Sequence, residues 1–327
     1  MRVMTKRVGW VLAGLFLAGV VGAVLLMRGS AHGLPREAWV APAPSASSWA
    51  EVLARPPVVT LHTLGTGCSL VFRPEMLRRD SPERNAVPEP HAPLPVFAHL
   101  VRHPKYGDVL IDSGLSAEFA RDSFGNIGRP ARWVMRLLLA PFSQGVGEDI
   151  GSQLRRLDAR PQRVFFTHLH PDHTSGIPSL PPGVSLVTGP GEADDFASMF
   201  GYGHFDGVSR LEEIDFTSAP TLPPLGRVVD VFGDGSLWAV FTPGHSRGHL
   251  SFVVNAVGGP VLLTGDATHF RWAFEHGIGP AAPRAEAEPE GQRSLDALRA
   301  FSQAFPSVRV LYGHEAPGQN ADPACAR

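Results

Sequence analysis

The chain has 327 residues, of which 43% are hydrophobic, so it can build one large domain or two small ones around a substantial core. Its 29 basic and 31 acidic side chains nearly cancel, which leaves no basic footprint for nucleic acid. The two cysteines, Cys68 and Cys325, form no CxxC pair, so neither a disulfide framework nor a zinc ribbon is indicated.

The N-terminus carries an uncharged, mostly apolar segment, Val8–Met27, which follows three basic residues. A membrane-spanning helix needs about 20 apolar residues, whereas the apolar part of a cleavable signal usually has about 7–15. We therefore expect residues 1–30 to form an uncleaved transmembrane anchor or signal. The preceding basic residues place the N-terminus in the cytoplasm and the rest of the chain on the extracytoplasmic side. The alternative is a secreted protein, cleaved near Ala23 or Ala31.

Residues 31–56 follow this segment and include APAPSASS at positions 41–48. A stretch rich in Pro, Ala and Ser without an apolar period is typical of a linker. We expect a folded domain over residues 57–316 and a C-terminal tail over residues 317–327.

Within that domain, short apolar segments alternate with helical patterns. Residues 73–95 are charged and Pro-rich and indicate an exposed loop. Helices are predicted at 131–142, at 147–157 with Asp149 near its start, and at 292–305. Strands are predicted at 58–64, 69–72, 96–103, 108–112, 163–168, 184–189, 237–242, 250–255, 260–266 and 308–314. Strands interleaved with helices, several of them apolar on both faces, favour an α/β sandwich with covered sheets.

The segment THLHPDH, residues 167–173, contains three histidines and an aspartate directly after an apolar strand. Residues two apart in an extended chain point the same way, so His168 and His170 can aim at one point. Pro171 then turns the chain, and Asp172 and His173 leave in another direction. Imidazole and carboxylate together are typical zinc ligands, and two divergent pairs suit two neighbouring metal ions.

Three later segments show the same pattern of a strand followed by a turn and a candidate ligand. His245 lies in the turn after 237–242, Asp266 ends the strand at 260–266, and His314 ends the last strand. Sites in layered α/β folds gather at strand ends. Together with the histidine cluster these residues form a coherent candidate metal site.

The whole set resembles the metallo-β-lactamase superfamily, since HLHPDH fits the HxHxDH motif and His245, Asp266 and His314 follow in the family's order. The resemblance covers about residues 58–316. Segments 96–115, 232–251 and 261–269 are most similar to the N-acyl homoserine lactone lactonases and their relatives. The resemblance implies a four-layer αββα sandwich with a site for two Zn²⁺, or other divalent ions, between the sheets.

By position in the motif, the resemblance implies that His168, His170 and His245 bind one ion. Asp172, His173 and His314 would bind the other, and Asp266 would bridge the two. Two ions about 3.5–4 Å apart share a water and lower its pKa toward ~7, and the resulting hydroxide attacks a lactone or other ester carbonyl. Asp172 would also orient the hydroxide or carry a proton.

One position departs from the lactonase branch, where a tyrosine typically stands three residues after the bridging aspartate. Here that position is His269. An imidazole titrates nearer neutral pH than a phenol, so His269 is expected to donate a hydrogen bond or a proton to the substrate oxygen as a second catalytic residue. General-acid help of this kind is worth roughly 10²–10⁴ in rate.

Other functions are weighed on the same residues. His170 stands where redox di-iron relatives usually carry a carboxylate, and zinc β-lactamases lack an aspartate in the role of Asp266. The alternatives kept open are a phosphotriesterase- or thioesterase-type hydrolase on the same dinuclear site and, less favoured, a non-enzymatic membrane-tethered binding domain. The expected partners are a small ester or lactone and the membrane, with no nucleic acid. The oligomeric state stays open.

The remaining candidates receive structural interpretations. His62, His99 and His103 lie in or near strands and are expected to be structural. His249 opens a strand and is expected at most to orient the site, and Cys68 is expected to be a small packed residue.

Overall fold

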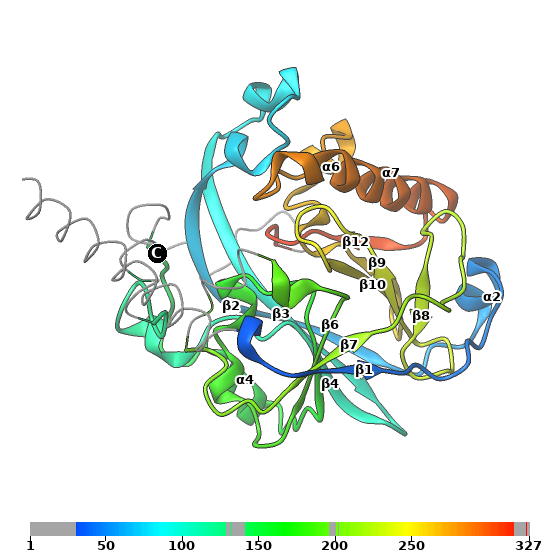
Figure 1. Ribbon diagram of the computed structural model, residues 1–327, viewed down its shortest axis with the longest axis horizontal. Coiled ribbons are helices and arrows are strands. Elements are labelled where there is room, and N and C mark those ends of the chain that lie inside the picture. The colour runs from blue at the N-terminus through cyan, green and yellow to red at the C-terminus, as the bar shows by residue number, and fades with distance from the viewer. Residues whose placement is uncertain are drawn as a thin grey trace, which may run out of the picture.

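The computed structural model describes residues 31–128, 132, 141–195, 201, 203–316 and 325, which form two β-sheets with helices on their outer faces (Figure 1). The larger sheet has seven strands in the order β1 (Arg36–Trp39), β7 (Leu211–Ile214), β6 (Ser185–Thr188), β5 (Arg163–Phe165), β4 (Gly107–Ile111), β3 (His91–His103) and β2 (Thr60–Phe72). The smaller sheet has five strands in the order β12 (Arg309–Leu311), β11 (Gly259–Leu263), β10 (Leu250–Ala256), β9 (Leu237–Phe241) and β8 (Val228–Asp230).

Helices cover both outer faces. The α-helices are α2 (Trp49–Ala54), α4 (Ile150–Arg156), α5 (Pro171–Thr174), α6 (Arg271–His276) and α7 (Glu288–Ala304). The 3₁₀ turns are η1 (Ala31–Gly33), η2 (Arg73–Met76), η3 (Pro82–Ala86), η4 (Ala117–Ala120), η5 (Ile177–Ser179), η6 (Glu192–Asp194), η8 (Gly265–Ala267) and η9 (Ala285–Ala287).

Three apolar clusters hold the layers together. Between the sheets, side chains such as Phe165 and Phe252 pack into one core. On the outer face of the larger sheet, Ile150 of α4 contacts a second cluster. On the outer face of the smaller sheet, Trp49 of α2 and Phe301 of α7 contact the third. Because these strands are buried on both faces, their sequences are continuously apolar. The predicted α/β sandwich with covered sheets is confirmed.

The prediction that residues 31–56 form a linker is wrong. Residues 36–39 form β1, which pairs in parallel with β7 at the edge of the larger sheet. Helix α2 begins after Ser48, whose side chain accepts a hydrogen bond from the Glu51 N–H. Trp49 is buried and donates from Nε1 to the Leu222 carbonyl at 3.0 Å. The folded domain therefore begins by residue 31. A buried tryptophan can fix a segment to the core even where the sequence shows no apolar periodicity.

Several boundaries also differ from prediction. Residues 58–64 and 69–72 belong to one continuous strand, β2, in which a bulge between Gly65 and Gly67 interrupts the register with β3. The predicted loop at 73–95 ends earlier, since β3 begins at His91. Helix α7 begins four residues before the predicted start at 292, and strands β7 and β8 and helix α6 were not predicted. The second helix was predicted from residue 147 and begins at Ile150, but the predicted place of Asp149 near its start is confirmed, because Asp149 caps α4 by accepting from Ser152 N.

Cys68 is buried, as expected for a packed residue, but it also takes part in a disulfide that the sequence did not indicate. Cys68 forms a disulfide with Cys325, across 257 positions of sequence. Both cysteines are thereby paired. The spacing of two distant cysteines carries no information about contact, so only the folded chain identifies the pair.

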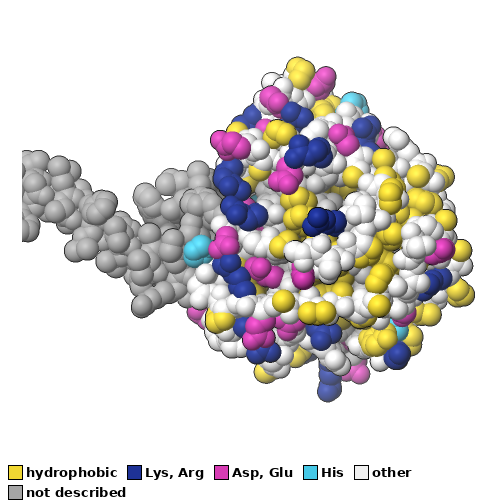
Figure 2. Space-filling view, turned by 45° about the vertical axis from the view of Figure 1, so that its right-hand side comes forward, with side chains coloured by type: hydrophobic (Ala, Val, Ile, Leu, Met, Phe, Trp, Pro, Cys, Tyr) yellow, Lys and Arg dark blue, Asp and Glu magenta, His cyan; other side chains and the backbone are white. Residues whose placement is uncertain are grey.

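Three sequence predictions fall outside the described residues. These are the anchor at residues 1–30, nearly all of the helix at 131–142, and the tail at 317–327 apart from Cys325. In the part of the chain that the structure describes, no helix is both long and apolar enough to span a bilayer. Acidic and basic side chains are interspersed on the face shown in Figure 2, in keeping with the net charge of −2.

Candidate metal centre

The candidate ligands come from five segments that meet at one edge of the sandwich. His168 and His170 follow β5, and Asp172 and His173 lie on the short helix α5 that continues from them. His170 is the N-cap of α5 and Pro171 is its first residue, which is the favoured place for proline in a helix. The remaining ligand candidates follow strands of the smaller sheet, with His245 after β9, Asp266 in η8 after β11, and His314 after β12.

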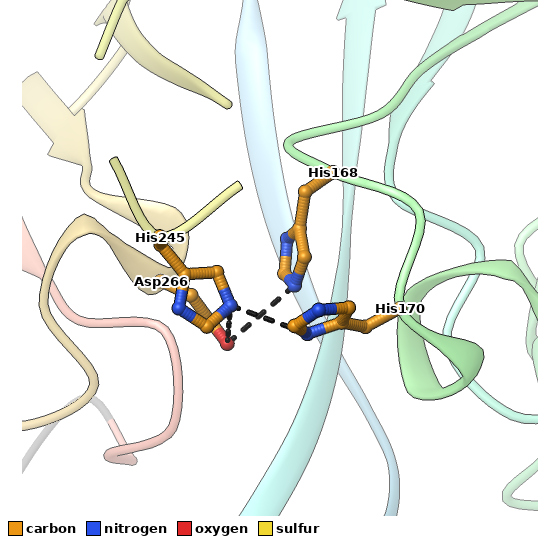
Figure 3. A group of neighbouring side chains, drawn as sticks. All are labelled: His168, His170, His245 and Asp266. Atoms are coloured by element: carbon orange, nitrogen blue, oxygen red, sulfur yellow. Dashed lines mark hydrogen bonds and ion pairs between the residues drawn. The ribbon is translucent and has the colours of Figure 1, made fainter. Parts of the chain in front are cut away.

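The structure brings four of these residues together as a first ligand group, defined as His168, His170, His245 and Asp266 (Figure 3). One ligand atom from each residue lies within 4.8 Å of the others. Asp266 Oδ2 is 3.6 Å from His168 Nε2 and 3.4 Å from His245 Nε2. His245 Nε2 is 3.2 Å from His170 Nδ1. Four donors converge on one point, as a tetrahedral ion requires.

A second ligand group consists of Asp172, His173 and His314, whose ligand atoms also lie within 4.8 Å of one another. Asp172 Oδ2 is 3.4 Å from His173 Nε2 and 3.6 Å from His314 Nε2. Asp266 Oδ1 is 3.2 Å from His314 Nε2 and 3.9 Å from His173 Nε2. Asp266 therefore lies between the two groups, with Oδ2 toward the first and Oδ1 toward the second, and Oδ2 also lies 3.3 Å from His314 Nε2.

The protonation states of the first ligand group suit metal binding. Burial lowers the pKa of His170, and it lowers those of His168 and His245 well below the ordinary histidine value. Burial alone would raise the pKa of Asp266, but the neighbouring His314, His269 and His168 hold it well below its usual range. At neutral pH this group thus combines neutral imidazoles with an ionised carboxylate, which is the protonation state that metal binding needs.

The second group differs. Burial would lower the pKa of His173, but Asp172 and Asp112 raise it well above the ordinary value. Burial would also lower the pKa of His314, but the charge of Asp266 outweighs burial and raises this pKa above the ordinary value. Asp172 has a pKa of about 2, since the histidine charges overcome the effect of burial. Without an ion, the two imidazoles hold protons that a metal must displace.

The donor set fits divalent ions of the zinc class. Buried polar atoms normally find a partner. Here the ring atoms Nε2 of His168, His170 and His173 and the carboxylate Oδ1 of Asp266 are buried without a hydrogen-bond partner. Three ring nitrogens and one carboxylate oxygen, all buried and without a hydrogen-bond partner, favour a metal site at this position.

Asp112 orients this site, although the sequence interpretation did not include it. It follows β4, and its carboxylate accepts from the Thr167 backbone N–H at 2.7 Å and the Thr167 hydroxyl at 2.8 Å. The other ring nitrogen of His173, Nδ1, lies 2.8 Å from Asp112 Oδ2. A donor at Nδ1 leaves Nε2 unprotonated for a metal ion. Asp112 was identifiable, because it too directly follows an apolar strand.

Two further contacts fix ring orientation. His314 Nδ1 donates to the Pro95 carbonyl at 2.8 Å, because a carbonyl can only accept, and Nε2 therefore faces the Asp266 carboxylate. His249 Nε2 accepts from the Asp266 backbone N–H at 3.0 Å, and its Nδ1 lies 2.9 Å from the Thr242 hydroxyl. His249 therefore holds the backbone of Asp266, in line with the orienting role expected for it.

His269 faces the candidate centre. Its Nε2 lies 3.3 Å from Asp266 Oδ2, and its ring stacks on His314 with centroids 5.8 Å apart. The opposite nitrogen, Nδ1, is buried and has no hydrogen-bond partner among the described residues. The residue is thus placed where a substrate group bound at the centre could meet it.

The other histidines lie in structural contacts. His103 Nε2 is 2.7 Å from Asp234 Oδ2, and His99 Nδ1 is 3.1 Å from the Thr63 hydroxyl. His62 contacts Thr60 on the same strand.

Comparison with known proteins connects this geometry to a family. Residues 91–301 match the family model of the metallo-beta-lactamase superfamily. The chain is 32% identical over 239 residues to the N-acyl homoserine lactonase AttM of Azorhizobium caulinodans, which covers 68% of this chain and 82% of the relative. It is 30% identical over 236 residues to AttM of Agrobacterium fabrum, with the same two coverages.

Solved structures show the same fold at lower identity. One is an N-acyl homoserine lactone hydrolase with the product N-hexanoyl-L-homoserine bound at its catalytic metal centre. The TM-score is 0.58 at 18% identity, over 79% of this chain and 94% of that one. Another, the quorum-quenching N-acyl homoserine lactone hydrolase, gives a TM-score of 0.58 at 17% identity.

Proposed function

The chain belongs to the metallo-beta-lactamase superfamily as a lactonase-like member, and from this premise we propose that it hydrolyses lactones or related esters with two divalent ions of the zinc class. The observation that carries the proposal is the convergence of the two ligand groups on the two oxygens of Asp266. The lactone substrate of the AttM relatives supports the choice of the ester class over phosphate or amide.

His168, His170 and His245 would hold one ion, Asp172, His173 and His314 would hold the other, and Asp266 would be available as a ligand to either. When bound, the ions supply Lewis acidity toward the carbonyl and a water that is activated near neutral pH. The protein itself supplies fixed geometry, because the ligand rings are buried and their other nitrogens are largely held by Thr167, Asp112 and the Pro95 carbonyl.

Asp172 is proposed to act on the attacking water as well as on the metal. Its carboxylate is ionised over the working pH range, since its pKa is about 2. An ionised carboxylate accepts a hydrogen bond from water and so orients the oxygen lone pair toward the carbonyl carbon. Its 14% side-chain exposure leaves one side open to a small molecule.

His269 is proposed to act on the leaving group. The cleaved ester releases an alkoxide, which needs a proton or a hydrogen bond as the bond breaks. His269 Nδ1 has no partner among the described residues, whereas Nε2 is held beside Asp266. The unpaired nitrogen is therefore the atom proposed to meet the substrate oxygen.

The test is a substrate panel on the full chain loaded with zinc, compared with the protein stripped by a chelator. N-Acyl homoserine lactones, simple γ-lactones and aryl esters are expected to be hydrolysed well, and β-lactams poorly, with about two ions per chain by elemental analysis. Full activity without metal would overturn the proposal. Preference for a phosphotriester or a thioester over every lactone tested would replace it with the corresponding alternative.

The location is a separate proposal. We propose that residues 1–30 anchor the chain and leave the hydrolase domain on the extracytoplasmic side. The Cys68–Cys325 disulfide supports this side, because disulfides persist in oxidising compartments and are rare in the cytosol. The intact chain should stay with membranes after a carbonate wash. A mature N-terminus near Ala31 would instead indicate secretion.

A further inference from the structure

Glu192 is a buried carboxylate that belongs to neither ligand group. It begins the 3₁₀ turn η6 after β6 and is 1% exposed. Burying a carboxylate costs several kcal/mol unless it is paired or fully hydrogen-bonded. Its partners therefore explain why the fold retains it.

Those partners lie on the two loops that carry the histidines of the first ligand group. Oε1 accepts from the backbone N–H of Leu169, the residue between His168 and His170, at 2.9 Å. Oε2 accepts from the Ser246 hydroxyl at 2.7 Å and from the Gly248 N–H at 2.8 Å, just after His245. One side chain thus joins the β5–α5 loop of the larger sheet to the β9–β10 loop of the smaller sheet.

The backbone around Glu192 is shaped for this contact. A Cβ on Gly189 would lie 1.8 Å from the Gly248 carbonyl oxygen, and a Cβ on Gly248 would lie 2.7 Å from the Glu192 Cβ. Only glycine at both positions allows the two segments to approach so closely. Asp195 strengthens the same contact, since its Oδ2 accepts from the Arg247 N–H at 3.1 Å.

The second ligand group is oriented by different residues. His173 is held by the Asp112 carboxylate and His314 by the Pro95 carbonyl. All three Glu192 hydrogen bonds go to the loops of His168, His170 and His245 instead. Disturbing Glu192 should therefore affect the two ions unequally.

We propose that Glu192 is a positioning residue for the first ligand group, which fixes the separation between the His168–His170 loop and the His245 loop. The inference rests on the proposed dinuclear function and adds a residue that selectively tunes one of its two sites. Outer partners of this kind are typically worth 10–100-fold in metal affinity.

Glu192→Gln is the sharpest test, because it keeps the shape of the side chain. Its single carbonyl oxygen can accept from Leu169 or from the Ser246–Gly248 pair, and the amide N–H₂ then faces donors on the other side. Ser246→Ala removes one donor and leaves the others. Asp194→Asn is the matched control, since Asp194 lies on the same 3₁₀ turn but has a 39% exposed side chain paired with Arg36.

The readout is stepwise metal binding by the full chain, measured by competition with a fluorescent zinc chelator and by elemental analysis. His314→Ala identifies which step belongs to the second group. We expect Glu192→Gln to weaken the first-group ion by roughly 10–100-fold while the second-group ion changes by less than about 3-fold. Ser246→Ala should move the same step by a smaller factor, and Asp194→Asn should move neither.

Equal weakening of both ions in Glu192→Gln, or no change in either, would overturn the inference and leave Glu192 as an ordinary part of the fold. If Glu192→Gln fails to fold, Ser246→Ala decides alone, and unchanged first-group affinity counts against the inference. A wild-type chain that binds no metal would instead overturn the proposed function itself, so the two failures are distinguishable.

Discussion

The two ligand groups share Asp266 but are prepared in opposite ways. The first group has histidines whose pKa values are lowered by burial, so they are neutral before an ion arrives. The second group has His173 and His314 with raised pKa values, because carboxylates surround them. The histidines of the first group can therefore bind an ion without losing a proton, whereas those of the second group must release protons when an ion binds.

The groups also differ in their support. The first group spans both sheets through Glu192, and the second depends on Asp112 and on the Pro95 carbonyl of β3. Two candidate ligand groups that look equivalent in a sequence motif thus differ in the pKa values of their histidines and in their outer partners.

His168→Ala removes a first-group ligand and should abolish metal binding there. Because an ion contributes several kcal/mol to catalysis, kcat/KM for a lactone should fall by about 10³-fold or more. His62→Ala is the control, since His62 lies on β2, outside both ligand groups, and its side chain contacts Thr60. Elemental analysis accompanies the kinetics, and retained activity with a metal content near wild type would contradict the assignment.

His269→Phe keeps an aromatic ring but removes both nitrogens, including Nδ1, the atom proposed to meet the substrate oxygen. We expect kcat to fall by roughly 10²-fold, at the low end of general-acid effects, with both ions retained. His269→Tyr should recover part of the lactonase activity, because a phenol can still donate a hydrogen bond. Unchanged kinetics in His269→Phe would remove the residue from the mechanism.

Lowering the pH should release the second-group ion first. Below the raised pKa values of His173 and His314, each ring binds a proton that competes with metal, and every displaced proton costs about tenfold in affinity per pH unit. The histidines of the first group stay neutral in the same range, since their pKa values are lowered. Zinc titrations at pH 8, 7 and 6 test this, and parallel losses at both steps would contradict it.

Cys325→Ser should have the smallest effect on activity and a clear effect on stability. Removing a disulfide that closes a long loop typically costs about 2–5 kcal/mol of unfolding free energy. Cys68 also pairs across the β2–β3 ladder with Pro95, whose carbonyl holds His314. The second-group ion should therefore loosen slightly and the first should not.

Denaturant unfolding and zinc titration measure both effects of Cys325→Ser. The double variant Cys68→Ser/Cys325→Ser is the control and should match the single variant. Two free thiols in the denatured, non-reduced wild type would contradict the disulfide on which the prediction rests.

Much of the site was readable from the sequence because its ligands follow a local rule. His168, His170 and His173 lie within one strand end and one turn, and the other candidates each directly follow an apolar strand. The direction of neighbouring side chains depends on the two-residue period of extended chain and on Pro171. Asp112 obeys the same rule at the end of β4, so the sequence contained its signal too.

Other features had no local signal. Strand β1 lies in a segment with the composition of a linker, and it is a strand only because β7, far along the chain, pairs with it. Glu192 is an ordinary glutamate until the fold brings Leu169 and Gly248 to its two oxygens. Strand propensity is weak where a segment is short and at an edge, so tertiary pairing decides.

The ligand types, their order and the direction of each local cluster can be read from the sequence, because they depend on residue identity and on backbone geometry over a few residues. Which groups become neighbours depends on how the chain folds. The fold placed Asp266 between the two ligand groups, joined Cys68 to Cys325 across 257 positions, and buried Glu192 between two loops. Contacts between residues so far apart in sequence arise when the two sheets pack together, and the apolar periodicity of a single segment does not predict them.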